Sequence, residues 1–131
     1  MNAERVENKE NLWPEQLLLA NPRGFCAGVV RAVEALREFQ FNYQIRHSGS
    51  ITYSYHEIIH NTHVVQVFEE LGVIFVDDVN KIPDGGNVMF SAHGVSPSVR
   101  KQADERKLHW DDATCPLVEK PHREVKKVAE Q

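Results

Sequence analysis

The sequence lacks the features that mark membrane, secreted and nucleic-acid-binding chains. Its 131 residues contain no apolar run near the roughly 20 residues that cross a bilayer. Basic side chains are in the minority, 15 against 19 acidic ones, which disfavours a nucleic acid or an anionic membrane surface as the main partner. Residues 1–14 are polar and acidic, without the apolar centre of a signal peptide or the Arg-rich bias of a transit peptide. These absences predict a cytoplasmic protein.

Cysteine is also scarce, because Cys26 and Cys115 are the only two. In a reducing cytoplasm, two cysteines are expected to be reduced ligands rather than a disulfide. Each stands at a predicted helix start, Cys26 in PRGFCAG and Cys115 in DATCP. A thiolate there is stabilised by free backbone N–H groups and by the helix dipole, which suits metal or cluster binding. Two thiolates rarely complete a metal site, so the pair predicts part of one.

What the sequence does contain is an alternation of short apolar runs and amphipathic segments, with 41% hydrophobic residues. The pattern predicts an α/β fold with a mainly parallel sheet and flanking helices. The predicted strands are residues 16–20, 51–55, 73–76, 88–92 and 108–111. The predicted helices are residues 27–38, a segment capped by Asn61 and ended by Gly72, a segment from Ser96 to about Lys107, and residues from Pro116 onward.

Four motifs follow these strands, and ligands in parallel sheets bind beyond the carboxyl ends of the strands. They are ANPRGFCAG after QLLLA, HEIIHN after ITYSY, SAHGVS after VMF, and DATCP after LHW. Packing alone does not explain four strand ends rich in Cys, His and Gly. Their shared edge therefore predicts a functional site.

The histidines in two of these motifs have competing interpretations. His60 lies beside a predicted helix start, where it could donate to a phosphate or diphosphate or simply cap the helix. The letters HExxH also fit a zinc protease, but that motif needs a continuous helix, which the strand end here disfavours. His93, followed by Gly94 and the helix cap Ser96, is typical of an anion cradle, although short His-Gly turns are common. Four further histidines are interpreted as incidental: His47, His63, His109 and His122.

Taken together, the segments LLLANPRGFCAGVVRAVE, YHEIIHN, IPDGGNVMFSAHGVSPSVR and DATCPLVEK resemble the N-terminal part of the 4-hydroxy-3-methylbut-2-enyl diphosphate reductase (LytB) family. The resemblance runs from about Leu17 to the C-terminus. It implies an iron–sulfur enzyme of the non-mevalonate isoprenoid pathway, which reduces an allylic diphosphate to isopentenyl and dimethylallyl diphosphate. It also implies a ferredoxin or flavodoxin as electron donor, and a fold of three similar α/β domains around a central cluster.

Residue by residue, the resemblance implies that Cys26 and Cys115 are two of three cysteine ligands of a 4Fe-4S cluster. His60 and His93 match the family's early diphosphate- and substrate-binding histidines. The third cysteine and the family's catalytic acid have no counterpart among the 131 residues. Residues 39–54 are longer than the family's usual connection. We therefore expect a polar leader (1–15), an opening strand and loop (16–25), a first α/β domain (26–114) and the start of a second, truncated domain (115–131).

Two alternatives stay open beside a truncated reductase. The chain could be an inactive fragment or a half-protein that needs a complementing chain. It could also be a small zinc-binding domain that uses Cys26, His60, His93 and Cys115, although four separate loops without close CxxC spacing disfavour this.

Overall fold

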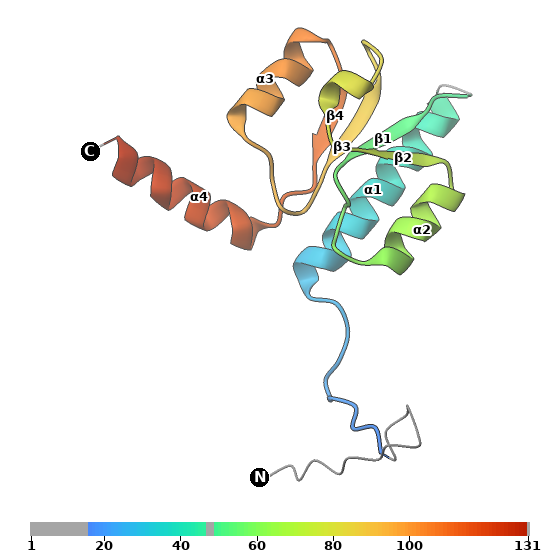
Figure 1. The fold of residues 1–131 in the computed structure, drawn as a ribbon, viewed down its shortest axis with the longest axis vertical. Helices are drawn as coiled ribbons and strands as arrows, with labels where there is room; N and C mark the ends of the chain where they lie inside the picture. Colours follow the sequence, from blue (N-terminus) through green and yellow to red (C-terminus); the bar gives the residue numbers. More distant parts are fainter. Residues whose placement is uncertain (1–15, 47–48, 131) are drawn as a thin grey trace, which may run out of the picture.

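The computed structural model describes residues 16–46 and 49–130. These residues form a four-stranded parallel sheet with helices on both faces (Figure 1), which confirms the predicted α/β class. The elements in chain order are α1 (Ala27–Arg46), β1 (Thr52–Tyr55), α2 (Thr62–Glu70), β2 (Val73–Val76), the 3-10 helix η1 (Val79–Lys81), β3 (Asn87–Phe90), α3 (Pro97–Glu105), β4 (His109–Asp112) and α4 (Pro116–Ala129).

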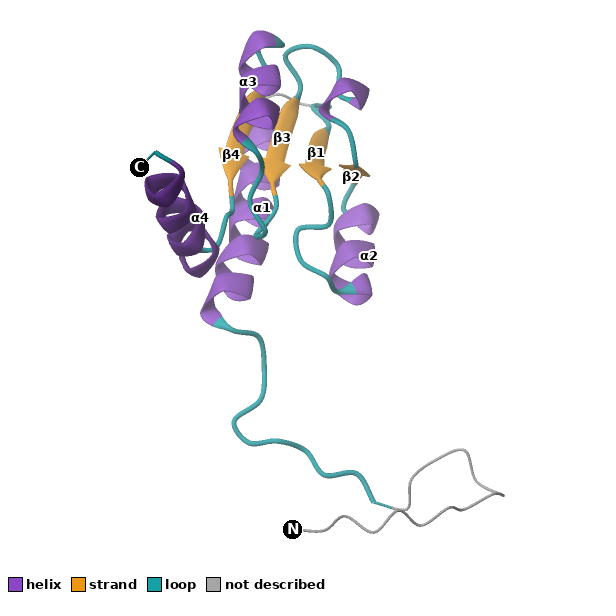
Figure 2. Cartoon of the chain, turned by 60° about the vertical axis from the view of Figure 1, so that its left-hand side comes forward, coloured by secondary structure: helices purple, strands orange, loops and turns teal. Residues whose placement is uncertain are grey.

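The register of the sheet brings the ends of its strands into one row. The strands lie in the order β2-β1-β3-β4, and each neighbouring pair is parallel. Tyr55 pairs with Val76 on one side and with Phe90 on the other, and Phe90 pairs with Asp112. The loops after β1, β3 and β4 therefore leave the sheet along one edge (Figure 2), where three of the four sequence motifs lie.

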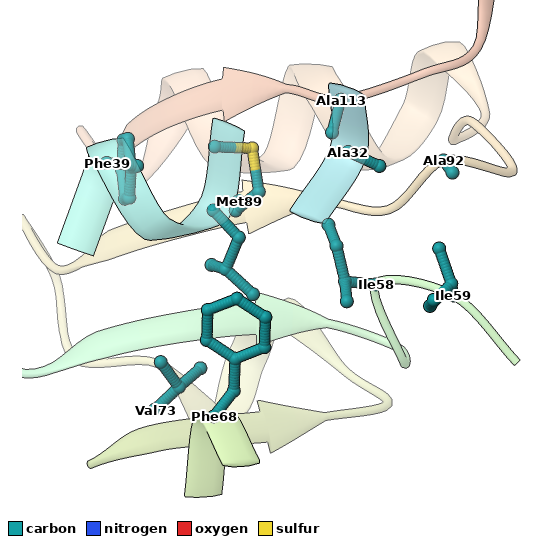
Figure 3. Close-up of a cluster of buried hydrophobic side chains, with 10 residues drawn as sticks. Ala32, Phe39, Ile58, Ile59, Phe68, Val73, Met89, Ala92 and Ala113 are labelled. Atoms are coloured by element: carbon teal, nitrogen blue, oxygen red, sulfur yellow. The ribbon is translucent and has the colours of Figure 1, made fainter. Parts of the chain in front are cut away.

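Alternating strand residues divide the core between the two faces of the sheet, as the two-residue period of a strand requires. Met89 packs with Leu36 of α1 and Phe68 of α2, and Figure 3 shows most of this cluster. Its neighbours Val88 and Phe90 pack on the opposite face. There they meet the 3-10 helix and Ala103 of α3, so helices cover both faces.

Helix α1 is longer than the sequence indicated, because it continues past residue 38 to Arg46. Phe39 and Gln40 are buried, and the Gln40 side-chain amide donates to the backbone oxygen of Leu71 at the end of α2. The ring of Tyr43 packs on Phe39 with centroids 4.6 Å apart. Much of the segment 39–54, predicted as an unusual connection, is thus helix. His47 lies outside the described residues.

The predicted opening strand at residues 16–20 is wrong in this structure, which has coil there. Its leucines are exposed, Leu18 by 83%. A parallel strand ahead of α1 would ordinarily pair beside β1, but β1 already has β2 on one side and β3 on the other. The apolar run therefore has no free neighbour at that position in the described sheet.

Helix α4 begins beside β4 and runs away from the sheet (Figure 1). None of its residues is buried, and Leu117, Val125 and Val128 are largely exposed. Pro121 lies within its second turn. Among the described residues, no helix is long and apolar enough to span a membrane.

Candidate functional site

Three loops at the carboxyl edge are tied together by backbone hydrogen bonds that continue beyond the strands. The Ala92 amide donates to the Ile58 carbonyl over 3.2 Å, and the Cys115 amide donates to the Ala92 carbonyl over 3.0 Å. Ile58 and Ala92 are buried in the core. The loops after β1, β3 and β4 are thereby fixed relative to one another, with His60, His93 and Cys115 next to their anchored residues.

Both cysteines cap helices, as the sequence predicted. The Cys26 carbonyl accepts from the Val30 amide over 3.1 Å at the start of α1. The Cys115 carbonyl accepts from Val118 over 2.8 Å and from Glu119 over 3.0 Å at the start of α4. Each cysteine thus stands at the N-terminus of a helix, which is the positive end of the helix dipole and where the first-turn N–H groups have no intrahelical acceptor. A helix N-terminus of this kind suits an anionic ligand.

The two thiols converge on Gly28, the second residue of α1. A β-carbon built on Gly28 would lie 2.5 Å from Cys115 Sγ and 3.9 Å from Cys26 Sγ. Both sulfurs therefore surround one point, although 89 residues separate them in the sequence. Both cysteines are free thiols; Cys26 is exposed and Cys115 half-buried.

The two predicted histidines form a stacked pair. The ring centroids of His60 and His93 are 4.2 Å apart and the planes are inclined by 21°. His60 Nδ1 also lies 3.3 Å from Glu57 Oε2. Burial, and then the neighbouring His60, hold the pKa of His93 below its ordinary value of 6.5. The neutral imidazole therefore predominates at neutral pH, and an anion bound nearby would favour the protonated form.

All four predicted site residues line one cavity of about 390 Å³. Cys26, Cys115, His60 and His93 share it with Asn61 and Gly28, and the rest of its wall is apolar: Phe25, Val29, Ile59, Ala92 and Val118. A volume of this size and an apolar wall with few polar groups are typical of small-molecule and cofactor sites. The structure thus brings the four predicted residues together in one cavity, which the sequence alone could not establish.

The thiol pair fits part of an iron–sulfur site. Cysteine thiolates are the usual ligands of such clusters, and the two sulfurs approach the same point from two helix starts. The sequence offers no third cysteine. Within the described part of the chain, no three His, Cys, Asp or Glu side chains are arranged to hold a metal ion.

Sequence reasoning missed two residues that lie beside the loops of this site. His122, interpreted as incidental, lies beside the loop of His93, because its Cε1 is 3.5 Å from where a Gly94 β-carbon would stand. Asp112 accepts from the Thr114 amide over 2.8 Å and pairs with Arg100 of α3, so it holds the turn that leads to Cys115. The sequence signal for the role of Asp112 was available, because Asp112 stands two residues before Thr114 in the Thr-Cys-Pro turn.

A parallel sheet whose carboxyl edge gathers two thiols and two imidazoles defines this chain as an α/β domain with a candidate ligand-binding cavity at that edge. Residues 17–131 match the model of the family described as LytB protein. The chain belongs to the LytB protein family.

Curated relatives carry the name 4-hydroxy-3-methylbut-2-enyl diphosphate reductase. The chain is 50% identical over 118 residues to the protein from Rhodopirellula baltica, covering 90% of this chain and 35% of that protein. It is 50% identical over 120 residues to the protein from Mycobacterium leprae, covering 92% of this chain and 35% of that protein. The chain thus spans about a third of the length of the curated relatives it matches.

Solved structures of reductases share the fold. The structure of the E-1-hydroxy-2-methyl-but-2-enyl-4-diphosphate reductase from Plasmodium falciparum aligns with a TM-score of 0.74 and 44% identity, over 84% of this chain and 33% of that one. A structure described as the terminal enzyme of the non-mevalonate pathway aligns with a TM-score of 0.67 and 31% identity, over 87% of this chain and 38% of that one.

Proposed function

We propose that this chain forms one part of the active site of a 4-hydroxy-3-methylbut-2-enyl diphosphate reductase. In the proposed reaction, the allylic diphosphate takes up two electrons and two protons, loses its hydroxyl group as water, and becomes isopentenyl or dimethylallyl diphosphate. The single observation that carries the proposal is the cavity shared by Cys26, Cys115, His60 and His93, which come from four separate loops. A ferredoxin or flavodoxin is the proposed source of the electrons, and the cytoplasm the proposed compartment.

Cys26 and Cys115 are the proposed cluster ligands of this chain. A bound 4Fe-4S cluster would supply the redox chemistry and a Lewis-acidic iron for the substrate hydroxyl. The chain's own contribution is to present two thiolates from helix starts, where the dipoles and free N–H groups offset negative charge. The apolar side chains Phe25, Val29 and Ile59 line the same cavity and would limit water around it.

His60 and His93 are the proposed ligands of the substrate diphosphate. Their stacked rings present donors on the wall of the same cavity as the thiols, so phosphate groups would lie close to the redox centre. The low pKa of the free His93 means that diphosphate binding would favour proton uptake there, because a nearby anion stabilises the imidazolium. In this proposal, the proton taken up on diphosphate binding is held by the His93 imidazole, which contacts the substrate.

A chimera tests this proposal directly. Residues 17–131 replace the matching third of the Rhodopirellula baltica relative, and the anaerobically reconstituted chimera is assayed for turnover of the allylic diphosphate. We expect turnover from the chimera, and its loss in the Cys26→Ser and Cys115→Ser variants. Lys127→Gln is a matched control, because Lys127 is exposed and lies outside the cavity. Turnover that survives replacement of both cysteines would refute the proposal.

A second candidate is a half-protein completed by a separate chain. The exposed Leu17, Leu18 and Leu19 and the apolar side chains of α4 favour it, because such surface is ordinarily covered. In this proposal α4 begins a second domain that a complementing chain continues. Co-purification with the other two thirds of a relative, followed by cluster analysis, would separate this candidate from an inactive fragment.

A further inference from the structure

Gly28 occupies the narrowest point between the two thiols. A β-carbon there would lie 2.5 Å from Cys115 Sγ and 3.3 Å from Cys115 Cβ, whereas real β-carbons essentially never approach another heavy atom within 3.0 Å. The sulfur of Cys115 therefore occupies space that the side chain of any other residue at position 28 would fill. Cys26 Sγ lies 3.9 Å from the same point.

The backbone does not require glycine at this position. Gly28 is not among the residues with positive φ, unlike Gly24 just before it. It lies within α1, where alanine is favoured over glycine by up to about 1 kcal/mol. Helix propensity therefore argues against this glycine, and the close approach of the Cys115 sulfur explains it.

Cys115 cannot easily withdraw to make room for a larger residue. Its amide donates to Ala92, and its carbonyl accepts the first two hydrogen bonds of α4. Its backbone is thus held from both sides. A β-carbon on residue 28 would instead rotate the thiol away or displace the start of α1, and either change alters the spacing of the two sulfurs.

We propose that Gly28 is a positioning residue that sets the separation of the Cys26 and Cys115 thiols, so that both can bind one thiophilic centre. This positioning role deepens the proposed function. The identification of the bound centre as an iron–sulfur cluster rests on that proposed function. The geometric claim can be tested without the cluster, because Cd²⁺ binds paired thiolates and reports on them by a charge-transfer absorbance. An inactive chimera would therefore count against the proposed function without touching this inference.

The test compares the reduced 131-residue chain with its Gly28→Ala variant in anaerobic Cd²⁺ titrations. We expect wild type to bind Cd²⁺ through both thiols, and Gly28→Ala to bind it roughly 10- to 100-fold more weakly, the usual effect of disturbing the residues that orient metal ligands. Cys26→Ser and Cys115→Ser should each lose the two-thiolate absorbance. Equal Cd²⁺ affinity and absorbance in wild type and Gly28→Ala would overturn the proposal.

A second comparison separates thiol positioning from a general defect in folding. Gly28→Ala is introduced into the Cys115→Ala background, where the clashing sulfur is absent. There we expect the thermal midpoint to stay level or rise with the better helix former, whereas in wild type it should fall. An equal fall of the thermal midpoint in both backgrounds would mean that the alanine disturbs α1 itself, and would contradict the proposal. This comparison applies even if Gly28→Ala is too unstable for Cd²⁺ titration.

Discussion

At the scale of single residues, the pKa of His93, a member of the histidine pair, is shifted by its surroundings. His93 is held toward its neutral form by burial and by the stacked His60, whereas Glu57 acts in the opposite direction, and His56 adds a smaller lowering effect. Protonation of the free protein at His93 therefore works against the folded state. An anion bound in the cavity that both rings line would oppose that preference, because a nearby negative charge stabilises the imidazolium.

This lowered pKa predicts a pH-dependent stability. Between the folded pKa of His93 and 6.5, the unfolded chain binds more protons than the folded chain, so the free energy of unfolding should rise with pH and level off above 6.5. His93→Gln should reduce this slope. Urea unfolding at a series of pH values measures it, and His63→Gln, on α2 and outside the cavity, is the control. Identical slopes for wild type and His93→Gln would contradict the assignment.

Helix starts are the elements that build this site. Asn61 caps α2, with its side-chain oxygen accepting from the Val64 amide over 3.1 Å, and Ser96 caps α3 in the same way. Cys115 caps α4 without a side-chain hydrogen bond, so its thiol remains available to a ligand. The side chains of Asn61 and Ser96 thus stabilise their helices, whereas the side chain of Cys115 makes no cap hydrogen bond.

The Asn61 cap gives a prediction at the scale of one helix. Asn61→Ala should lower the free energy of unfolding by about 1 kcal/mol, the usual value for a lost cap. Asn61→Asp should retain most of that stability, because a carboxylate accepts the same hydrogen bond and favours the helix dipole. Urea denaturation of both variants checks this. An equal loss in Asn61→Asp and Asn61→Ala would show that the Val64 bond is not the stabilising contact.

Sequence patterns predicted the elements that depend on local chemistry. The caps Asn61 and Ser96, the strand at 73–76 and the helix starts at both cysteines all agree with the structure. The predictions that differ from the structure concern segments whose conformation depends on contacts between residues far apart in the sequence. Residues 16–20 have the composition of a strand, but both sides of β1 are already paired. Helix α1 continues to Arg46 because Phe39 and Gln40 are buried in the fold.

The same distinction holds for the site. The motifs identified Cys26, His60, His93 and Cys115, since their residue types and helix-start positions are visible in sequence. The role of Gly28 was not visible, because it depends on the approach of a thiol 87 residues away. The holding of the Cys115 turn by Asp112 likewise depends on where α3 presents Arg100.

At the scale of the whole molecule, the described chain brings two thiols and two imidazoles to one edge of a single sheet. Its two cysteines converge in one cavity, but the chain spans about a third of the length of its curated relatives. The exposed apolar faces of residues 17–19 and of α4 lie at opposite ends of the described chain. We therefore expect its thiols to act as two ligands of a larger site.

Anaerobic reconstitution of the isolated 131-residue chain with iron and sulfide tests this central claim most directly. Iron and acid-labile sulfide are counted per chain, and absorbance and EPR follow the cluster. The account predicts that two thiolates do not retain a stoichiometric four-iron cluster, whereas the chimera, which supplies the remaining ligands, does. A persistent four-iron cluster with reductase turnover in the isolated chain would contradict the account.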